Sequence, residues 1–435
     1  MLNVEGKVRL SASDLVGHLN CHYLTRLDLA VADGELDKPS IWDPVLEVLV
    51  ERGALHERGY VEHLKLNGFE VESVEGSFID ASTVRQTIDA MRAGARIISQ
   101  GALQSGQWSG RADILRRVER PSELGAWSYE VIDTKLARET KGNTVLQICL
   151  YSDLVSAVQK LTPELAYVVT PGSNYEPQEF RFADYAAYYR RVRRSLERAV
   201  TTGFEAESYP DPKPHCEICR WRGHCDAKWR EDDHPSLVAG ISKSQIGELA
   251  KHGITTTAEL ADLPLPFPWK PDRGALPSYE RVREQARLQV QGRADGKVIY
   301  ETLSPTPGLG LSRLPPLSNG DVFLDLEGDP FVDEGGLEFL FGYAFKDDGT
   351  DSYTRHWALS RPEEKGGFER FIDFVTTRLG TYPDLHIYHF APYEPAALKR
   401  LMGRYATREV SWTECFGPVC SSICTQSCAM ESVPA

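Results

Sequence analysis

The residues best suited to chemistry lie in two short segments, "QWSGRADILRRV" and "WSYEVIDTKLARE". The first contains Asp113, and the second contains Asp133 and Lys135 separated by one residue. Carboxylates are the hard oxygen ligands that Mg²⁺ prefers, and an ammonium group beside them can stabilise charge on a phosphate. A D-x-K pattern alone is weak evidence, because a single carboxylate is more often a surface residue.

The elements that must position these side chains are two neighbouring strands. Side chains alternate along a strand, so Asp133 and Lys135 share one face while Thr134 points to the other. The polar segment 119–126 contains Pro121 and Gly125 and predicts a hairpin loop. The hairpin brings Asp113 next to Asp133, where the two carboxylates can hold one Mg²⁺ or Mn²⁺ ion that activates water.

Further residues in the expected order strengthen this interpretation. His56 lies upstream in "GALHERGY", and Gln147 and Tyr151 lie four residues apart in "QICLY", on one face of a predicted helix. The succession His, G-R-x-D, D-x-K and Q-x-x-x-Y resembles the RecB-type branch of the PD-(D/E)XK nucleases over about residues 1–230. The resemblance implies that His56, Asp113 and Asp133 bind metal, that Lys135 is catalytic, and that Gln147 and Tyr151 support the site and the DNA.

A cluster of cysteines closes the same region. The stretch "HCEICRWRGHC" has the spacing C-x2-C-x5-C at Cys216, Cys219 and Cys225, one ligand short of a four-thiolate site. Cys21 can supply the fourth ligand, whereas Cys149 lies within the Q-x-x-x-Y helix and is expected in the core. One early cysteine followed by this triplet resembles the iron–sulfur nucleases of the AddB and CRISPR-associated RecB-like types, which implies a [4Fe–4S] cluster. Structural Zn²⁺ is the alternative, because it also accepts four thiolates.

Two further units follow. Residues 240–265 predict two short helices around Gly253, either a helix-hairpin-helix element or a small helical linker.

In "DVFLDLEGDP", Asp325 and Glu327 alternate with apolar residues and resemble the first motif of the DEDD exonucleases of the RNase H-like superfamily. "LHIYHFAPYEPAALKRL" resembles their second motif, with Glu394 where an aspartate is usual. The last acidic motif of that family has no match before residue 435, because the final residues form a cysteine-rich tail instead. We therefore expect an incomplete second site.

Composition restricts the class of protein. Apolar residues form 41% and charged residues 26% of the chain, as in globular proteins. The net charge of −14 argues against a generally basic surface but not against a local one, such as the run of arginines in "YYRRVRRSLERAV"; that run can equally be a solvated helix face. The chain contains no apolar run of membrane-spanning length and no secretory signal, so we expect a cytoplasmic protein with no membrane partner.

Together these features predict an α/β protein with three parts. Residues 1–230 form a restriction-endonuclease-like nuclease domain with a four-cysteine cluster, 231–303 form the hairpin segment and linker, and 304–435 form a partial RNase H-like domain. The predicted function is a metal-dependent DNA nuclease acting on single strands or ends in repair, recombination or defence, with a helicase as a potential partner. The alternatives are a non-catalytic nucleic-acid-binding subunit of a repair complex and a nuclease whose four cysteines hold structural Zn²⁺ instead of an iron–sulfur cluster.

Overall fold

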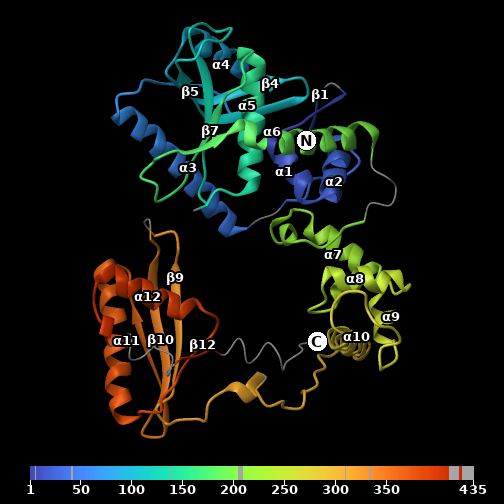
Figure 1. The fold of residues 1–435 in the computed structure, drawn as a ribbon, viewed down its shortest axis with the longest axis vertical. Coiled ribbons are helices and arrows are strands. Elements are labelled where there is room, and N and C mark those ends of the chain that lie inside the picture. The colour runs from blue at the N-terminus through green and yellow to red at the C-terminus, as the bar shows by residue number, and fades with distance from the viewer. Residues whose placement is uncertain are drawn as a thin grey trace. The chain divides into compact units, whose positions relative to one another are not determined.

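The computed structural model describes residues 1–4, 6–40, 43–137, 139–203, 209–308, 310–332, 335–410 and 421–423, the last three by their backbone alone. The chain divides into two compact units, Met1–Lys228 and Trp229–Ala435 (Figure 1). Within the described residues, no helix is both long and apolar enough to cross a bilayer.

The first unit is built on a mixed sheet with the strand order β3-β4-β5-β6-β7-β8. Neighbouring strands pair antiparallel except at β3–β4 and β6–β7, which are parallel. A separate hairpin, Leu2–Val4 (β1) with Lys7–Arg9 (β2), precedes it. The strands of the sheet are Val71–Ser73 (β3), Ile97–Ser105 (β4), Trp108–Val118 (β5), Ser128–Thr134 (β6), Leu165–Val169 (β7) and Gln178–Arg181 (β8).

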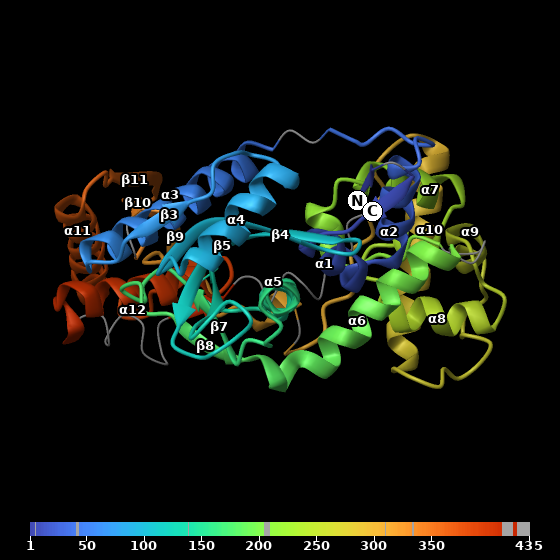
Figure 2. The same ribbon diagram turned by 90° about the horizontal axis from the view of Figure 1, so that it is seen from above.

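Helices cover both faces of this sheet because its central strands are apolar on both sides. Val131 packs into the core beneath α1, α4, α5 and α6, whereas the next residue, Ile132, packs beneath α3. Figure 2 shows α3 and α5 on either side of the sheet. The helices are Ala12–Asn20 (α1), His22–Ala32 (α2), Pro44–Leu66 (α3), Ala81–Ala93 (α4), Gly142–Gln159 (α5) and Phe182–Thr202 (α6).

The predicted hairpin and the predicted helix with Gln147 and Tyr151 are present. β5 and β6 pair antiparallel from Ile114 opposite Ile132 to Val118 opposite Ser128. β6 is buried along its whole length, and the helix predicted to contain Gln147 and Tyr151 is α5. In the C-x2-C-x5-C segment, Cys216 lies in the short 3₁₀ helix Pro214–Ile218 (η1), Cys219 directly follows η1, and Cys225 lies in Arg222–Glu231 (α7).

The second unit begins with a small helical region that has its own core. Lys243–Lys251 (α8) and Thr257–Ala261 (α9) each start with a capping box, at Ser242 and Thr256, which satisfies backbone donors at the helix start. Gly253, between them, has a φ of 78°, which a glycine adopts without steric cost. The other elements here are Pro235–Leu237 (η2), Leu276–Asp295 (α10) and Gly310–Arg313 (η3).

The second unit also contains a sheet with the strand order β11-β10-β9-β12-β13. β9 is parallel to β12 and antiparallel to β10, and Val322, Leu324 and Leu326 of β9 face a core formed with α11 and α12. The strands are Val322–Asp329 (β9), Leu337–Asp347 (β10), Thr350–Trp357 (β11), Ile387–His389 (β12) and Ser421–Ile423 (β13). The helices are Arg361–Thr381 (α11) and Tyr393–Tyr405 (α12).

Candidate active site

The β5–β6 hairpin brings the two carboxylates of the first unit together. Because Ile114 pairs with Ile132, Asp113 and Asp133 occupy the next facing positions. Asp113 Oδ2 accepts hydrogen bonds from Thr134 N at 2.7 Å and Thr134 Oγ1 at 2.8 Å. These bonds fix the Asp113 carboxylate beside β6.

Asp133 is the most deeply buried of these acids, with an exposed fraction of 0%. Burial and then the charge of Asp113 raise its pKa to about 7, although Lys135 opposes the shift. Lys135 Nζ lies 2.6 Å from Asp133 Oδ2 as an ion pair, yet this oxygen has no well-directed hydrogen bond from any described residue. A buried carboxylate oxygen whose partner among the described residues is an ammonium group lies at a place suited to a cation.

Helix α5 supplies the groups that hold Asp133 in place. Gln147 Nε2 donates to Asp133 Oδ1 at 3.3 Å and to Tyr151 Oη at 3.1 Å. Burial and the charge of Asp133 raise the pKa of Tyr151, so its hydroxyl stays protonated at neutral pH. Gly110 of β5 makes room for the tyrosine ring, since a Cβ there would lie 2.5 Å from Tyr151 Cε1.

A third carboxylate, Glu57, reaches this cluster and was not predicted. It is half-buried on α3, and burial followed by the charge of Asp113 raises its pKa. Gln100 Nε2 donates a short hydrogen bond to its carboxylate. Gln100 itself has a φ of 57°, a rare left-handed conformation for a residue with a Cβ. It lies opposite Asp113 at the one position where the β4–β5 register skips a pair.

The predicted metal ligand His56 lies next to Glu57 in the sequence but makes a different contact. Its Nε2 lies 3.2 Å from the carbonyl oxygen of Val169 at the end of β7, and its ring stacks on Tyr175 with the centroids 5.8 Å apart. The same carbonyl accepts a hydrogen bond from Lys135 N at 2.9 Å. His56 therefore contacts the backbone at the edge of the site, while Glu57 points toward the carboxylates.

The four predicted cysteine ligands come from segments nearly two hundred residues apart and meet in one region. Cys21 caps the start of α2, and Cys225 lies on α7 with an exposed fraction of 9%. Burial and then the charges of Cys219, Cys21 and Cys216 raise the pKa of Cys225 to about 12. All four are free thiols, as is Cys149, which is buried in α5. The tail cysteines Cys415, Cys420, Cys424 and Cys428 lie outside the described residues.

Neither cluster is a preassembled metal site. Within the part of the chain that the structure describes, no three His, Cys, Asp or Glu side chains are arranged to hold a metal ion as they stand. In the carboxylate cluster, the ammonium of Lys135 lies against Asp133 Oδ2, where a cation would otherwise lie. Two carboxylates with waters suffice for Mg²⁺, so the donor set of Asp113 and Asp133 fits such an ion once Lys135 no longer lies against Asp133 Oδ2.

The second unit contains another group of acids, at the positions predicted for it. Asp325 and Glu327 are exposed on the face of β9 away from the core. Burial and then the charges of Asp325, Glu327 and Glu338 raise the pKa of Glu394 at the start of α12. The Oε2 atom of Glu394 is buried without a hydrogen bond from a described residue, and it lies 3.6 Å from His389 Nδ1.

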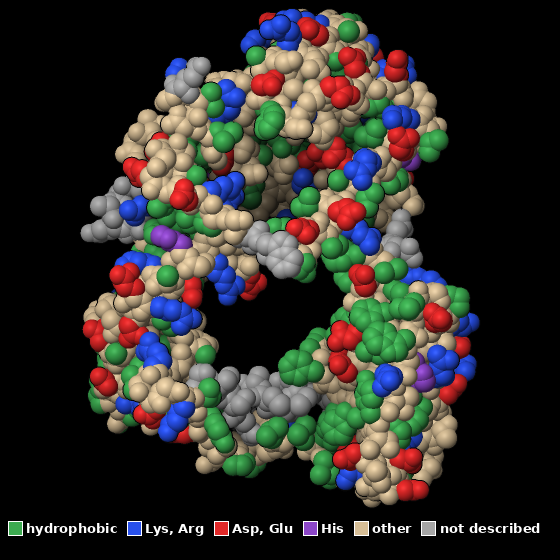
Figure 3. Space-filling model, turned by 180° about the vertical axis from the view of Figure 1, so that it is seen from behind, with side chains coloured by type: hydrophobic (Ala, Val, Ile, Leu, Met, Phe, Trp, Pro, Cys, Tyr) green, Lys and Arg blue, Asp and Glu red, His purple; other side chains and the backbone are tan. Residues whose placement is uncertain are grey.

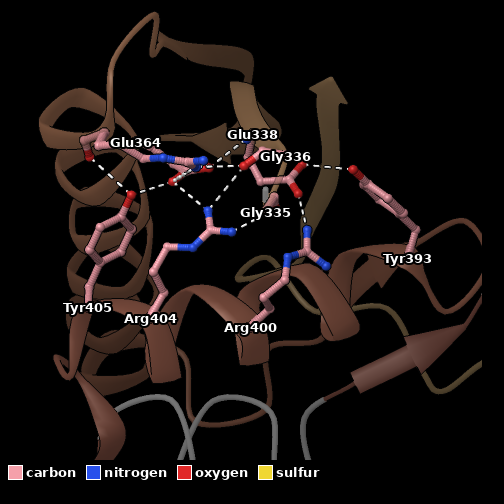
Figure 4. Close-up of polar contacts among 9 residues, drawn as sticks. Gly335, Gly336, Glu338, Glu364, Tyr393, Arg400, Arg404 and Tyr405 are labelled. Atoms are coloured by element: carbon pink, nitrogen blue, oxygen red, sulfur yellow. Dashed lines mark hydrogen bonds and ion pairs between the residues drawn. The ribbon is translucent and has the colours of Figure 1, made fainter. Parts of the chain in front are cut away.

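Glu338 of β10 is already occupied by protein groups (Figure 4). Tyr393 Oη donates to Glu338 Oε2 at 2.8 Å, and Arg400 pairs with the other oxygen. A neighbouring network centres on Glu364, which accepts from Glu338 N, Tyr405 Oη, Arg361 and Arg404. Burial alone would raise the pKa of Glu364, but these donors outweigh burial and lower it. The network ties α11 and α12 to the start of β10.

Comparison with known protein families agrees with this architecture. Residues 26–226 match the model of the PD-(D/E)XK nuclease superfamily, and residues 322–424 match the model of the RNase H superfamily. No curated protein sequence matches the chain. The two matched segments contain the carboxylate–lysine cluster and the Asp325–Glu327–Glu394 group, respectively.

Proposed function

The chain joins a domain of the PD-(D/E)XK nuclease superfamily to an RNase H-like domain, and on this premise we propose that it is a metal-dependent DNA nuclease whose active site contains Asp113, Asp133 and Lys135. The observation that carries the proposal is the buried Asp133 Oδ2, which has Lys135 as its ion-pair partner and belongs to a carboxyl group whose pKa the charge of Asp113 raises. A buried acid with a pKa near neutrality, paired with a specific charged partner, is typical of functional sites.

Each side chain has a defined role in this proposal. Asp113 and Asp133 hold Mg²⁺ or Mn²⁺, which when bound polarises the phosphate and lowers the pKa of a water molecule. Lys135 orients the attacking water or stabilises the charge that develops on the phosphate. Gln147 keeps Asp133 Oδ1 in place and is itself held by Tyr151. Glu57 and His56 lie at the edge of the site, where either can complete the ligand set.

A substrate panel tests the proposal. We expect cleavage of linear single-stranded DNA in Mg²⁺ or Mn²⁺, and loss of cleavage in Asp113→Asn. Circular single strands, blunt duplexes and RNA of matched length then distinguish exonuclease from endonuclease action and DNA from RNA. Binding without cleavage of every substrate in both metals would instead favour a non-catalytic subunit of a repair complex. The intact set of Asp113, Asp133 and Lys135 argues against that alternative.

For the cysteines we propose a [4Fe–4S] cluster held by Cys21, Cys216, Cys219 and Cys225. Support comes from their shared neighbourhood, in which the other three thiols act on Cys225, and from a donor set of four thiols. The cluster would tie the start of α2 to the segment around α7, which is a structural role. Anaerobic purification followed by iron, sulfide and zinc analysis distinguishes the two alternatives. Stoichiometric zinc without iron would identify a structural zinc site in place of the cluster.

We also propose that Asp325, Glu327 and Glu394 form a second metal site in the RNase H-like domain. The buried Glu394 Oε2 without a hydrogen-bond donor supports it, as does the shift that the other two acids cause in its pKa. A double variant, Asp325→Asn with Glu327→Gln, should leave the cleavage that depends on Lys135 intact and remove any activity that survives Lys135→Ala. If Lys135→Ala already removes all cleavage, the second site contributes none.

A further inference from the structure

Helix α6 packs one face against the first unit and leaves the opposite face uncovered. Ala186, Tyr189, Val192 and Leu196 are its buried residues. Tyr189 Oη donates to Asp153 of α5 at 3.0 Å, and α6 also contacts α1 (Figure 2). Since α5 also carries Gln147, α6 belongs to the same helical layer as the candidate active site.

The uncovered face carries arginines that no described acidic side chain neutralises. Arg190, Arg191, Arg194 and Arg198 are exposed, and none of them forms an ion pair with another described residue. Arg193, on the buried side, pairs with Asp153 and Glu197. The other acid of the helix, Asp184, pairs with Arg181. Every acid of α6 is therefore occupied, and these four cations have no counter-charge within the helix.

An exposed aromatic side chain extends this row toward the start of the helix. Tyr188 is 52% exposed and precedes Arg191 by three residues, which places both on neighbouring positions of one face. Arg194 and Arg198 continue the row at the next turns. From Tyr188 to Arg198 the helix rises about 15 Å at about 1.5 Å per residue. We call Tyr188, Arg190, Arg191, Arg194 and Arg198 the α6 track.

The charge balance of the whole chain makes this row unusual. The net charge is −14, and on the face shown in Figure 3 basic and acidic side chains are interspersed. A linear group of unpaired arginines on such a chain offers complementarity to a polyanion. Arginine forms bidentate contacts with phosphate, and an exposed tyrosine ring can stack on a base.

We propose that the α6 track binds the sugar-phosphate backbone of a single-stranded nucleic acid, with Tyr188 stacking on an unpaired base. This inference rests on the proposed nuclease function and deepens it, because it assigns a substrate-binding surface outside the catalytic carboxylates. A single strand fits better than a duplex, since the bases of a duplex already stack on each other and cannot accept Tyr188. The arginines alone would not distinguish the two forms.

The test measures binding separately from cleavage. Fluorescence anisotropy of a labelled oligothymidylate of about 20 nucleotides, longer than the ~4–16-nucleotide sites of single-strand-binding domains, is recorded with the full-length chain in EDTA. Arg190→Glu with Arg194→Glu should weaken binding at least about tenfold. The double variant should also lower the slope of log K against log salt by about 1.4, because each of the two lost phosphate contacts contributes about 0.7. Tyr188→Ala should weaken single-strand binding at least about fivefold and leave binding to a duplex unchanged.

The matched control is Arg85→Glu with Arg92→Glu on α4. These two arginines are also exposed in the first unit, and the double variant changes the net charge by the same amount. It should bind like the parent chain. Equal weakening by both double variants would show a non-specific charge effect and overturn the proposal, as would unchanged binding in the α6 variant. Loss of binding to anionic lipid vesicles, with unchanged oligothymidylate binding, would reassign the track to a membrane surface. Since EDTA prevents cleavage, none of these results depends on the catalytic proposal.

Discussion

The burial of Asp133 leads to a quantitative prediction about stability. In the unfolded chain its pKa has the ordinary value of 3.8, and in the folded chain burial and Asp113 raise it to about 7. Because the folded-state pKa lies above the unfolded-state pKa, the proton bound to Asp133 stabilises the folded chain. This stabilisation is fully present when the pH is below the unfolded-state pKa. The effect is then lost as the pH rises through about 7.

The magnitude follows from the two pKa values. Their difference corresponds to about 4 kcal/mol, because one pKa unit is worth about 1.36 kcal/mol. Asp133→Asn removes the ionisable group, so the metal-free variant should not lose unfolding free energy when the pH rises. Relative to the parent chain, the variant should gain about 2–3 kcal/mol of unfolding free energy between pH 5 and pH 8.

The assay is urea unfolding of the full-length chain in EDTA, followed by tryptophan fluorescence at both pH values. Trp108 and Trp127 both lie in the first unit and report on it. Adding Mg²⁺ at pH 8 should stabilise the parent chain by about 2.7 kcal/mol at a hundredfold excess over its Kd and should stabilise Asp133→Asn much less. If the unfolding free energies of the two chains changed with pH in parallel, the claim that burial raises the pKa of Asp133 would be refuted.

Three further predictions concern other parts of the molecule. Gln147→Ala should lower cleavage about 10- to 100-fold without changing the melting temperature by more than a few degrees, as steady-state kinetics and calorimetry can check. Cys225→Ser should abolish the absorbance band near ~400 nm of a [4Fe–4S] protein, whereas Cys149→Ala should keep it. Glu364→Gln should destabilise the second unit by about 1–3 kcal/mol at pH 7. Because the pKa of Glu364 is lowered below the ordinary 4.5, that loss should shrink as the pH falls through the lowered value in urea titrations.

The sequence predicts the central hairpin because its signals are local. The alternation around Asp133 and the turn residues Pro121 and Gly125 specify two paired strands, and the structure contains them. The spacing of Gln147 and Tyr151 likewise places both on one face of α5, where they share a hydrogen bond. The edge strands β3 and β8 were not predicted, because short segments of three and four residues carry little periodic signal.

The arrangement of Glu57 and Gln100 could not be read from the sequence. Glu57 follows His56 directly, and successive side chains on a helix point about a quarter-turn apart, so the orientation of α3 over the sheet decides which one meets the carboxylates. Gln100 reaches Glu57 from a left-handed backbone conformation, which tertiary packing imposes and local sequence does not encode. The gathering of Cys21 with the later cysteines also depends on contacts over nearly two hundred residues.

The most direct test of the catalytic proposal compares two lysine variants of the full-length chain. Lys135→Ala removes the ion-pair partner of Asp133, whereas Lys65→Ala removes an exposed lysine of α3 in the same unit. Cleavage of linear single-stranded DNA in Mg²⁺ and Mn²⁺ is measured for both, with binding in EDTA as the control for folding. We predict that Lys135→Ala loses cleavage by at least about a hundredfold while binding normally, and that Lys65→Ala cuts like the parent. Equal cleavage by Lys135→Ala and the parent chain would contradict the account.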